Sequence, residues 1–331
     1  MNLLWLQSGG CGGCTLSWLG SEMGPLFATL RDEQLDILWH PSLSEATGTE
    51  AQELLRACAT GMTAVDILCI EGSMLRGPKG SGRFHLLAGT GIPTVDWVRQ
   101  LALRARHVVA VGTCAAFGGI TAAGNNPTEA CGLQYEGEHK GGLLGADFLD
   151  ATGLPVINIA GCPTHPDWVT ETLIALNRGE LNASDLDPLG RPRFYADHLV
   201  HQGCARNEYY EFKASAEHPT EQGCLMENLG CKGTQAHADC NLRPWNGSGS
   251  CLTGGYACIR CTEPGFEEPG HPFAETPKVA GIPIGLPADM PKAWFVALAA
   301  LSKSATPERV RENARADHVV RAPTIKGGRK L

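Results

Sequence analysis

Cysteine is the residue type whose number and spacing stand out in this sequence. The chain contains 14 cysteines in 331 residues, and thiolates bind zinc and iron–sulfur clusters or form disulfides. So many cysteines indicate either disulfides in an exported protein or metal ligation inside the cell. The first residues, MNLLWLQ, lack the basic and apolar regions of a signal peptide and a twin-arginine motif. We therefore expect a cytoplasmic protein whose cysteines are mostly metal ligands.

The first predicted ligand set lies in three glycine-rich segments. GGCGGC contains Cys11 and Cys14, GTC contains Cys114, and GCP contains Cys162. Glycines let backbone N–H groups approach thiolate sulfurs, which stabilises their negative charge. A single Cys-x-x-Cys pair would also suit zinc or a thioredoxin-like redox pair. Two further thiols of the same kind favour an iron–sulfur cluster with four thiolate ligands.

The second predicted set combines an imidazole with three thiols. His201 and Cys204 share the segment HQGC, and Cys224 and Cys231 follow. Such a set can hold zinc or a mixed-ligand iron–sulfur cluster, so it leaves the metal open. A single histidine is more often structural, but the His-x-x-Cys spacing with two later thiols favours a ligand role for His201.

The third predicted set lies in a segment rich in glycine and asparagine. Its members are Cys240, Cys251, Cys258 and Cys261. Four thiolates close either a zinc site or a four-iron cubane. The total favours clusters, because eleven cysteines and one histidine divide into three sets of four that could conduct electrons in series. Of the other cysteines, we expect Cys58 and Cys69 to be buried in a helix and a strand. Cys131, in a predicted loop, receives no role.

Alternating strands and helices must position the first set. Short apolar runs predict strands at 2–7, 36–40, 65–71, 107–113 and 155–160, and helical stretches include 50–60 and 95–104. This alternation predicts a flavodoxin-like α/β fold with a doubly wound parallel sheet. Ligands in such folds gather at the carboxyl ends of the strands. Cysteines follow the first, fourth and fifth strands, so we expect the first set to converge at one sheet edge.

The character of the chain changes after about residue 177, where strand patterns become rare and Gly, Pro, Asn and Cys become frequent. We therefore predict a flavodoxin-like domain over 1–178 that carries the first cluster. Residues 179–331 are predicted to form an irregular iron–sulfur cluster-binding domain with the other two sets and a C-terminal tail. A region with so little core usually depends on metal for its stability.

Composition excludes two classes of partner. The net charge is −8, and the one basic cluster, 326–330, lies at the end of the chain as a solvated tail, so nucleic-acid binding is not supported. No apolar stretch is long enough to cross a bilayer, since even 293–301 is far too short.

The cysteine segments resemble those of [NiFe] hydrogenase small subunits. The segments 7–14, 112–120 and 161–163 look like the proximal-cluster motifs of that family. His201-x-x-Cys204 with LGCKG at 229–233 resembles the distal-cluster motif. DCN at 239–241 and CIRCTEP at 258–264 resemble the medial one, and the match extends over 3–266.

The resemblance implies the electron-transfer subunit of a heterodimeric oxidoreductase. Its large-subunit partner holds the Ni–Fe centre that oxidises dihydrogen, and the small subunit contributes no catalytic residue. A redox acceptor or a sensor histidine kinase is expected near the distal cluster. The family also implies that Glu71 lies near the subunit interface, although a polar residue at a strand end is an equally good interpretation.

Three departures from the commonest pattern refine these expectations. Cys251 lies near a position where many relatives have proline, which implies three [4Fe–4S] clusters. Gly13 and Gly119 replace the extra cysteines of oxygen-tolerant membrane relatives, which implies an ordinary proximal cluster. The spacing between Cys224 and Cys231 is one residue wider than usual. Cys251, together with the expected lack of a signal peptide and of a C-terminal anchor helix, resembles the cytosolic class. We expect a dihydrogen-sensing regulatory hydrogenase; the alternatives are a cytosolic uptake enzyme and, more remotely, a zinc-stapled structural protein.

Overall fold

The computed structural model describes residues 1–270, 273–284 and 291–323. It contains two compact units. The first consists of Met1–Asp197 and Cys261–His271, and the second of His198–Arg260 and Pro272–Leu331.

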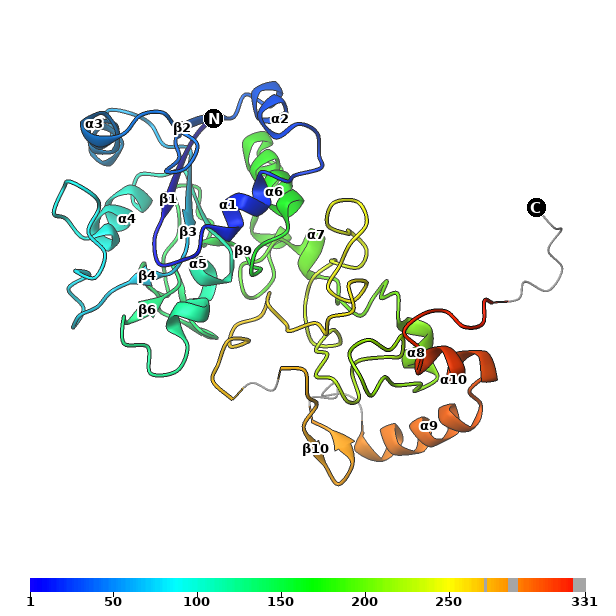
Figure 1. Cartoon of the computed structure of the whole chain (residues 1–331). Helices are drawn as coiled ribbons and strands as arrows, with labels where there is room; N and C mark the ends of the chain where they lie inside the picture. Colours follow the sequence, from blue (N-terminus) through cyan, green and yellow to red (C-terminus); the bar gives the residue numbers. More distant parts are fainter. Residues whose placement is uncertain (271–272, 285–290, 324–331) are drawn as a thin grey trace. The chain divides into compact units, whose positions relative to one another are not determined.

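A five-stranded parallel sheet organises the first unit (Figure 1). Its order is β2 (Asp36–Trp39), β1 (Asn2–Gln7), β3 (Ile67–Glu71), β5 (His107–Val111) and β9 (Ile157–Ile159). In chain order these strands run 2-1-3-4-5, which is the flavodoxin-like topology. The predicted fold class is therefore confirmed. All residues of β3, β5 and β9 are buried, as expected for a parallel sheet covered on both faces.

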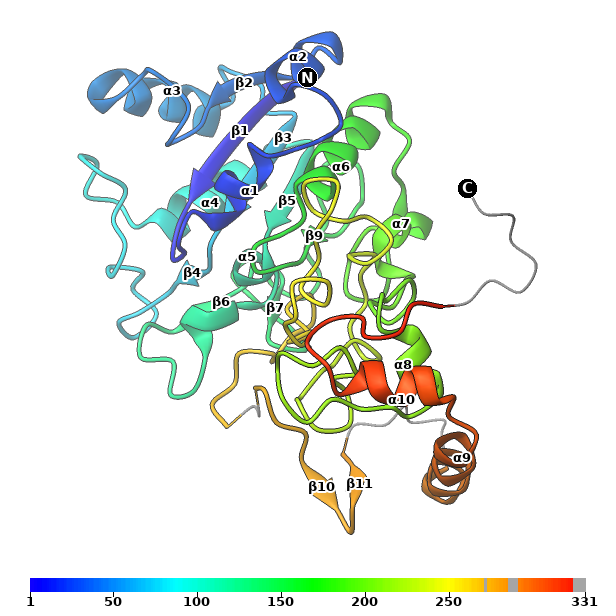
Figure 2. The same ribbon diagram turned by 45° about the vertical axis from the view of Figure 1, so that its right-hand side comes forward.

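Helices cover both faces of the sheet (Figure 2). On one face α3 (Gly48–Thr60) packs against α4 (Thr94–Ala102). On the other, α1 (Gly13–Trp18) packs against α6 (Pro166–Arg178), and α2 (Leu26–Asp32) lies nearby. Helix α1 is the next element after β1, so the packing of α1 on α6 fixes Cys14 in α1 and the end of the loop that contains Cys11.

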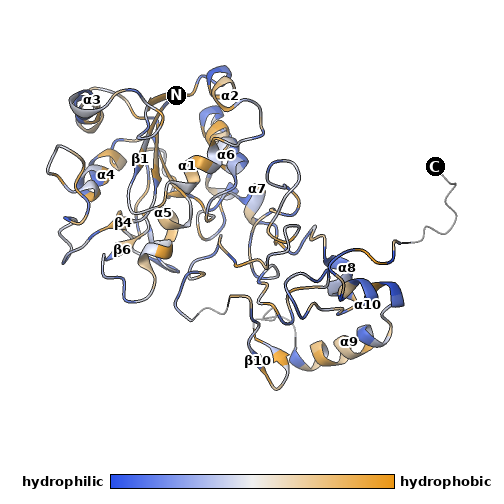
Figure 3. Cartoon of the chain, in the orientation of Figure 1, coloured by the Kyte–Doolittle hydropathy of each residue, from blue (hydrophilic) through white to orange (hydrophobic). Residues whose placement is uncertain are grey.

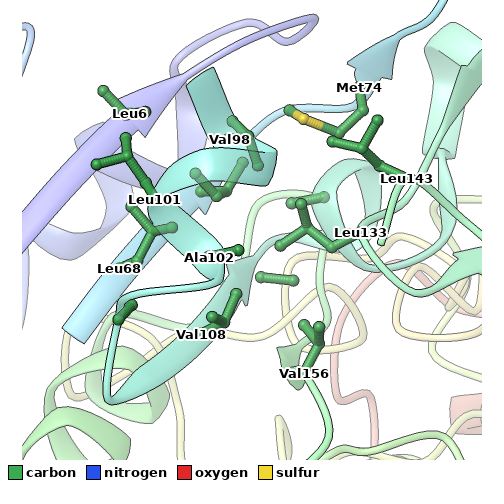
Figure 4. Close-up of a cluster of buried hydrophobic side chains, with 14 of the residues drawn as sticks. Leu6, Leu68, Met74, Val98, Leu101, Ala102, Val108, Leu133, Leu143 and Val156 are labelled. Carbon is green, nitrogen blue, oxygen red and sulfur yellow. The ribbon is translucent and has the colours of Figure 1, made fainter. Parts of the chain in front are cut away.

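The main core lies between α4 and the sheet (Figure 4). Val98 and Leu101 of α4 pack with Leu68 of β3 and Val108 of β5, and all four side chains are fully buried. Burial of each such side chain contributes about 1.5 to 3 kcal/mol. This layer holds the strands in register, so their carboxyl ends meet at one edge. Cys58 and Cys69 are also fully buried, in α3 and β3, as predicted.

Short elements complete the first unit. They are β4 (Met74–Leu75), α5 (Thr113–Phe117), η1 (Gly119–Ala122), β6 (Ala130–Cys131), β7 (Tyr135–Glu136), β8 (His139–Lys140), η2 (Ala183–Asp185) and α7 (Arg193–Ala196). The prediction that Cys131 lies in a loop is wrong. It is fully buried in β6 and pairs with Met74 of β4.

The first unit extends beyond the predicted boundary near residue 178 and ends its first segment at Asp197. Tyr195 explains the difference, because it is fully buried and its ring stacks on Trp168 with centroids 4.1 Å apart. Its hydroxyl donates to the carbonyl of Asn158 (3.0 Å) and accepts from the N–H of Ala160 (3.1 Å). Residues 179–197 have no strand pattern, but this aromatic contact ties them to α6, and the two hydrogen bonds tie them to the end of β9.

The second unit consists mainly of loops. Its elements are α8 (Asn207–Glu211), β10 (Lys278–Val279), β11 (Ile282–Pro283), α9 (Lys292–Ser304) and α10 (Glu308–Ala314). A small apolar cluster of Tyr209, Cys224, Val310 and Ala314 joins α8 to α10.

Helix α9 is apolar along most of its length (Figure 3). Trp294, Val296, Leu298 and Leu301 are exposed, and Phe295 is its buried side chain. Across residues 1–270, 273–284 and 291–323, no helix has both the length and the hydropathy needed to span a bilayer.

Candidate metal centres

The first predicted ligand set converges at the carboxyl edge of the sheet. Cys11 lies in the loop after β1 and Cys14 in the first turn of α1, while Cys114 follows β5 in α5 and Cys162 follows β9. Cys14 interacts electrostatically with Cys114 and Cys162, and Cys114 interacts with Cys11 and Cys162. The topology thus brings together four thiols that are remote in sequence.

Glycines allow the backbone to pass close to these sulfurs. A Cβ atom placed on Gly112 would lie 2.5 Å from the Sγ of Cys14, and one on Gly119 would lie 2.7 Å from the Sγ of Cys114. Both glycines have positive φ, +87° and +57°. Any larger residue at either position would therefore displace a thiol.

The electrostatics of the set indicate what it can bind. Burial raises the pKa of Cys14 above its ordinary range, and Glu71 and the neighbouring thiols raise it further. Burial and Cys162 raise the pKa of Cys114 to about 12. Thiols in this arrangement ionise together only when a cationic centre neutralises their charge. An iron–sulfur cluster is such a centre, so the donor set fits one.

The second predicted set lines one cavity within the second unit. His201, Cys204, Cys224 and Cys231 all contribute to its wall. Burial raises the pKa of Cys224 to about 12, and burial lowers the pKa of His201, which favours the neutral imidazole that a metal ligand requires. The ring of Tyr210 lies edge-on to His201, with centroids 4.3 Å apart. These four side chains fit a mixed-ligand cluster.

Arg206 is a residue of this cavity that the sequence analysis missed. It is 8% exposed, and its guanidinium donates to the carbonyls of Leu252 (3.2 Å), Glu221 (2.7 Å) and Gly223 (2.7 Å). Its backbone N–H donates to the Sγ of Cys204 (3.4 Å). An arginine two residues after a predicted ligand cysteine was the available sequence signal. Its guanidinium interacts electrostatically with Cys204, Cys224 and Cys231.

The third predicted set is divided between the two units. Cys240, Cys251 and Cys258 belong to the second unit and Cys261 to the first. Within the second unit, Cys258 is buried and Cys251 is exposed. The hydroxyl of Ser250 donates to Oδ1 of Asn241 (2.7 Å), which joins the residue before Cys251 to the residue after Cys240.

Within the first unit, Cys261 is held beside the loops of the first set. The Thr113 hydroxyl donates to the carbonyl of Cys261 (2.5 Å) and accepts from the N–H of Gly161 (2.9 Å). Thr113 and Gly161 immediately precede Cys114 and Cys162 in the sequence. The chain therefore returns at 261 to the edge where the first set lies.

No three or more His, Cys, Asp or Glu side chains of the described residues lie close enough together to hold a single metal ion. The fit of the first two sets to clusters rests on their donors, their burial and their mutual charge interactions.

Two family models match the chain. Residues 11–176 match the 20 kDa subunit of NADH ubiquinone oxidoreductase, and residues 196–274 match the C-terminal part of NiFe/NiFeSe hydrogenase small subunits. The small subunit of F420 non-reducing hydrogenase I from Methanosarcina mazei is 35% identical over 82% of this chain and 74% of its own. The periplasmic [NiFeSe] hydrogenase small subunit of Desulfomicrobium baculatum is 30% identical over 82% of this chain and 86% of its own.

The chain belongs to the [NiFe] hydrogenase small-subunit family. Solved structures agree. An actinobacterial-type NiFe-hydrogenase from Ralstonia eutropha H16 aligns with a TM-score of 0.75 and 27% identity, over 93% of this chain and 92% of that one. The reduced Ni-Fe-Se hydrogenase of Desulfomicrobium baculatum aligns with a TM-score of 0.69 and 30% identity, over 83% and 99%.

Family membership confirms the coarser expectations. The chain is the electron-transfer small subunit of an oxidoreductase, it pairs with a hydrogenase large subunit, and small subunits of this family carry iron–sulfur clusters. The interpretation as a zinc-stapled structural protein is therefore discarded.

Proposed function

We propose that this small subunit carries three [4Fe–4S] clusters, which relay electrons from dihydrogen oxidised at the Ni–Fe centre of the large subunit. The observation that supports this most strongly is the convergence of Cys11, Cys14, Cys114 and Cys162 at one sheet edge, where their charges interact. These four residues would hold the proximal cluster.

The other two clusters are assigned to the remaining sets. His201, Cys204, Cys224 and Cys231 would hold the distal cluster, and their shared cavity supports this assignment. Cys240, Cys251, Cys258 and Cys261 would hold the medial cluster. Backbone N–H groups donate to sulfur in the first two sets, as at Cys14, Cys114 and Cys204, and Arg206 supplies a positive charge beside the second.

We further propose that the complex acts in the cytoplasm as a dihydrogen sensor, passing its signal to a histidine kinase near the distal cluster. The alternative partner there is the redox acceptor of an uptake hydrogenase. Copurification of the native complex separates the two. Copurification of a histidine kinase whose autophosphorylation changes under dihydrogen would support sensing. Copurification of a respiratory electron carrier that the complex reduces rapidly under dihydrogen would overturn it.

Metal analysis of the anaerobically purified heterodimer tests the cluster assignment. The expected result is about twelve iron atoms and an equal amount of acid-labile sulfide per small subunit, beyond the iron of the Ni–Fe centre, because each cubane contains four of each. Stoichiometric zinc with little iron would contradict it.

A further inference from the structure

The carboxylate of Glu71, at the end of β3, is a buried hydrogen-bond hub. It is 4% exposed and accepts from five donors. Oε1 accepts from the backbone N–H groups of Cys14 (3.0 Å) and Thr15 (3.1 Å). Oε2 accepts from Nε1 of Trp5 (3.2 Å), Nε2 of Gln7 (2.9 Å) and the Thr15 hydroxyl. A carboxylate offers about four lone-pair sites, so its accepting capacity is used in full.

The sheet topology places this hub beneath the proximal loop. Glu71 and Gln7 are register partners in the β1–β3 ladder. The strand order reverses between β1 and β3, and such a switch point opens the crevice in which doubly wound folds bind ligands. The loop that leaves β1 here contains Cys11 and leads to Cys14 in α1.

His40 fixes the direction of the hydrogen bonds. Its ring is fully buried, and Nδ1 accepts from the N–H of Ser42 (3.0 Å), which places the ring proton on Nε2. Nε2 lies 3.3 Å from the Thr15 hydroxyl, so it donates to that oxygen and Thr15 donates to Glu71. All five partners of Glu71 are therefore donors, and this arrangement suits an ionised carboxylate.

We infer that Glu71 is a positioning residue for the proximal cluster. It holds the start of α1, and with it Cys14, in place, and its fixed negative charge lowers the reduction potential of the cluster. This inference rests on the assignment of Cys11, Cys14, Cys114 and Cys162 to that cluster. It goes beyond the two earlier interpretations of Glu71, an interface residue and a polar strand end.

One substitution removes the charge while keeping the contact with Cys14. Glu71→Gln keeps the size of the side chain and one oxygen for the N–H groups of Cys14 and Thr15, but it removes the charge and turns an NH2 group toward the three donors that Oε2 accepts from. Adding an electron to the cluster then meets less repulsion. We expect the ratio of reduced to oxidised proximal cluster at a fixed potential to rise about tenfold, which is about 59 mV for a one-electron couple.

Glu71→Asp is the complementary variant. It keeps the charge but shortens the side chain, so the N–H of Cys14 loses its partner. We expect a lower occupancy of the proximal cluster and an unshifted potential in the clusters that remain. Asp150→Asn is the matched control, because Asp150 is another buried carboxylate of this unit, with hydrogen bonds from His107 (3.1 Å) and Thr152 (2.7 Å).

The experiment is a potentiometric titration of the intact heterodimer followed by electron paramagnetic resonance, with iron analysis of each variant. Support requires a raised proximal potential in Glu71→Gln, unchanged distal and medial potentials, and no shift in Asp150→Asn. A wild-type proximal potential in Glu71→Gln, or an equal shift of all clusters, would overturn the inference. If the wild-type protein lacks four-iron clusters, the cluster assignment is wrong instead. Iron analysis of the wild type shows this before any variant is made.

Discussion

Gly112 and Cys14 approach each other so closely that position 112 has no room for a side chain. A Cβ atom there would lie 2.5 Å from the Sγ of Cys14, and the φ of Gly112 is +87°. The two residues are remote in sequence but meet because β1 and β5 end at the same sheet edge.

The first prediction follows from that contact. Gly112→Ala should displace the Cys14 thiol and remove the proximal cluster, which lowers the iron content by about one cubane while the distal and medial signals persist. The control is Gly179→Ala, because Gly179 also has positive φ (+69°) but no atom within 4 Å of the added Cβ. That variant carries a milder backbone strain, because Gly179 is in the left-handed helical region (ψ 25°) whereas Gly112 (ψ 158°) is in a region that glycine alone adopts readily, and it should retain all its iron. Full proximal occupancy in Gly112→Ala would contradict the prediction.

The second prediction concerns the ion pairs that bind two remote segments of the first unit together. Arg191 pairs with Asp187 (2.8 Å) and Glu263 (2.8 Å), and its side chain is only 3% exposed. Arg191→Met removes the cation that lies between two buried carboxylates, so the free energy of unfolding should fall by about 3 to 5 kcal/mol. Denaturant titration under anaerobic conditions measures the loss.

Two further variants test this mechanism. Arg191→Met combined with Glu263→Gln should recover part of the lost stability, because one uncompensated charge is removed. Arg178→Met breaks the more exposed pair with Glu33 and should have a much smaller effect. Equal losses for Arg178→Met and Arg191→Met would show that burial of the pair is not what matters.

The strands of the first unit were predictable because a parallel sheet buries both faces. The run at 2–7 coincides with β1, and the runs at 65–71 and 107–113 contain β3 and β5. The convergence of the first predicted ligand set followed from this topology, since cysteines after the first, fourth and fifth strands must meet at one edge.

Long-range polar contacts could not be predicted from the sequence. Glu71 hydrogen-bonds to Cys14, which lies 57 residues away, and no local pattern encodes that distance. The end of the first unit was misjudged for the same reason, because Tyr195 stacks on Trp168 across a stretch without periodicity. Cysteine spacing identifies candidate ligands, but the residues that tune them come from the fold.

The third prediction is a dependence of stability on pH. Burial lowers the pKa of His40 from 6.5 to about 4, although the charge of Glu71 acts in the opposite direction. The unfolded chain therefore binds a proton at His40 at a higher pH than the folded chain does. The stability from neutral His40 is complete above pH 6.5 and is lost as the pH falls from there toward 4.

His40→Gln keeps an N–H that can donate to Thr15 but removes this titration. The variant should thus show a flatter decline of the thermal midpoint between pH 8 and 5, measured anaerobically. His139→Gln, at an exposed position in β8, should retain the wild-type slope. A His40→Gln slope identical to wild type would mean that another group controls stability in this range.

The fourth prediction tests the ligand assigned to the open corner of the medial cluster. Cys251 is exposed, and its loop is tied to that of Cys240 by the bond from Ser250 to Asn241 (2.7 Å). A fourth thiolate retains the labile iron and adds negative charge, so wild type should hold a medial cubane of lower potential. Cys251→Pro should convert it to a three-iron cluster of higher potential, seen by electron paramagnetic resonance of the oxidised protein. Cys58→Ala, at a buried cysteine outside all three sets, should keep every cluster. A strong three-iron signal in undamaged wild type would instead make Cys251 a bystander, with Cys240, Cys258 and Cys261 as the only medial ligands.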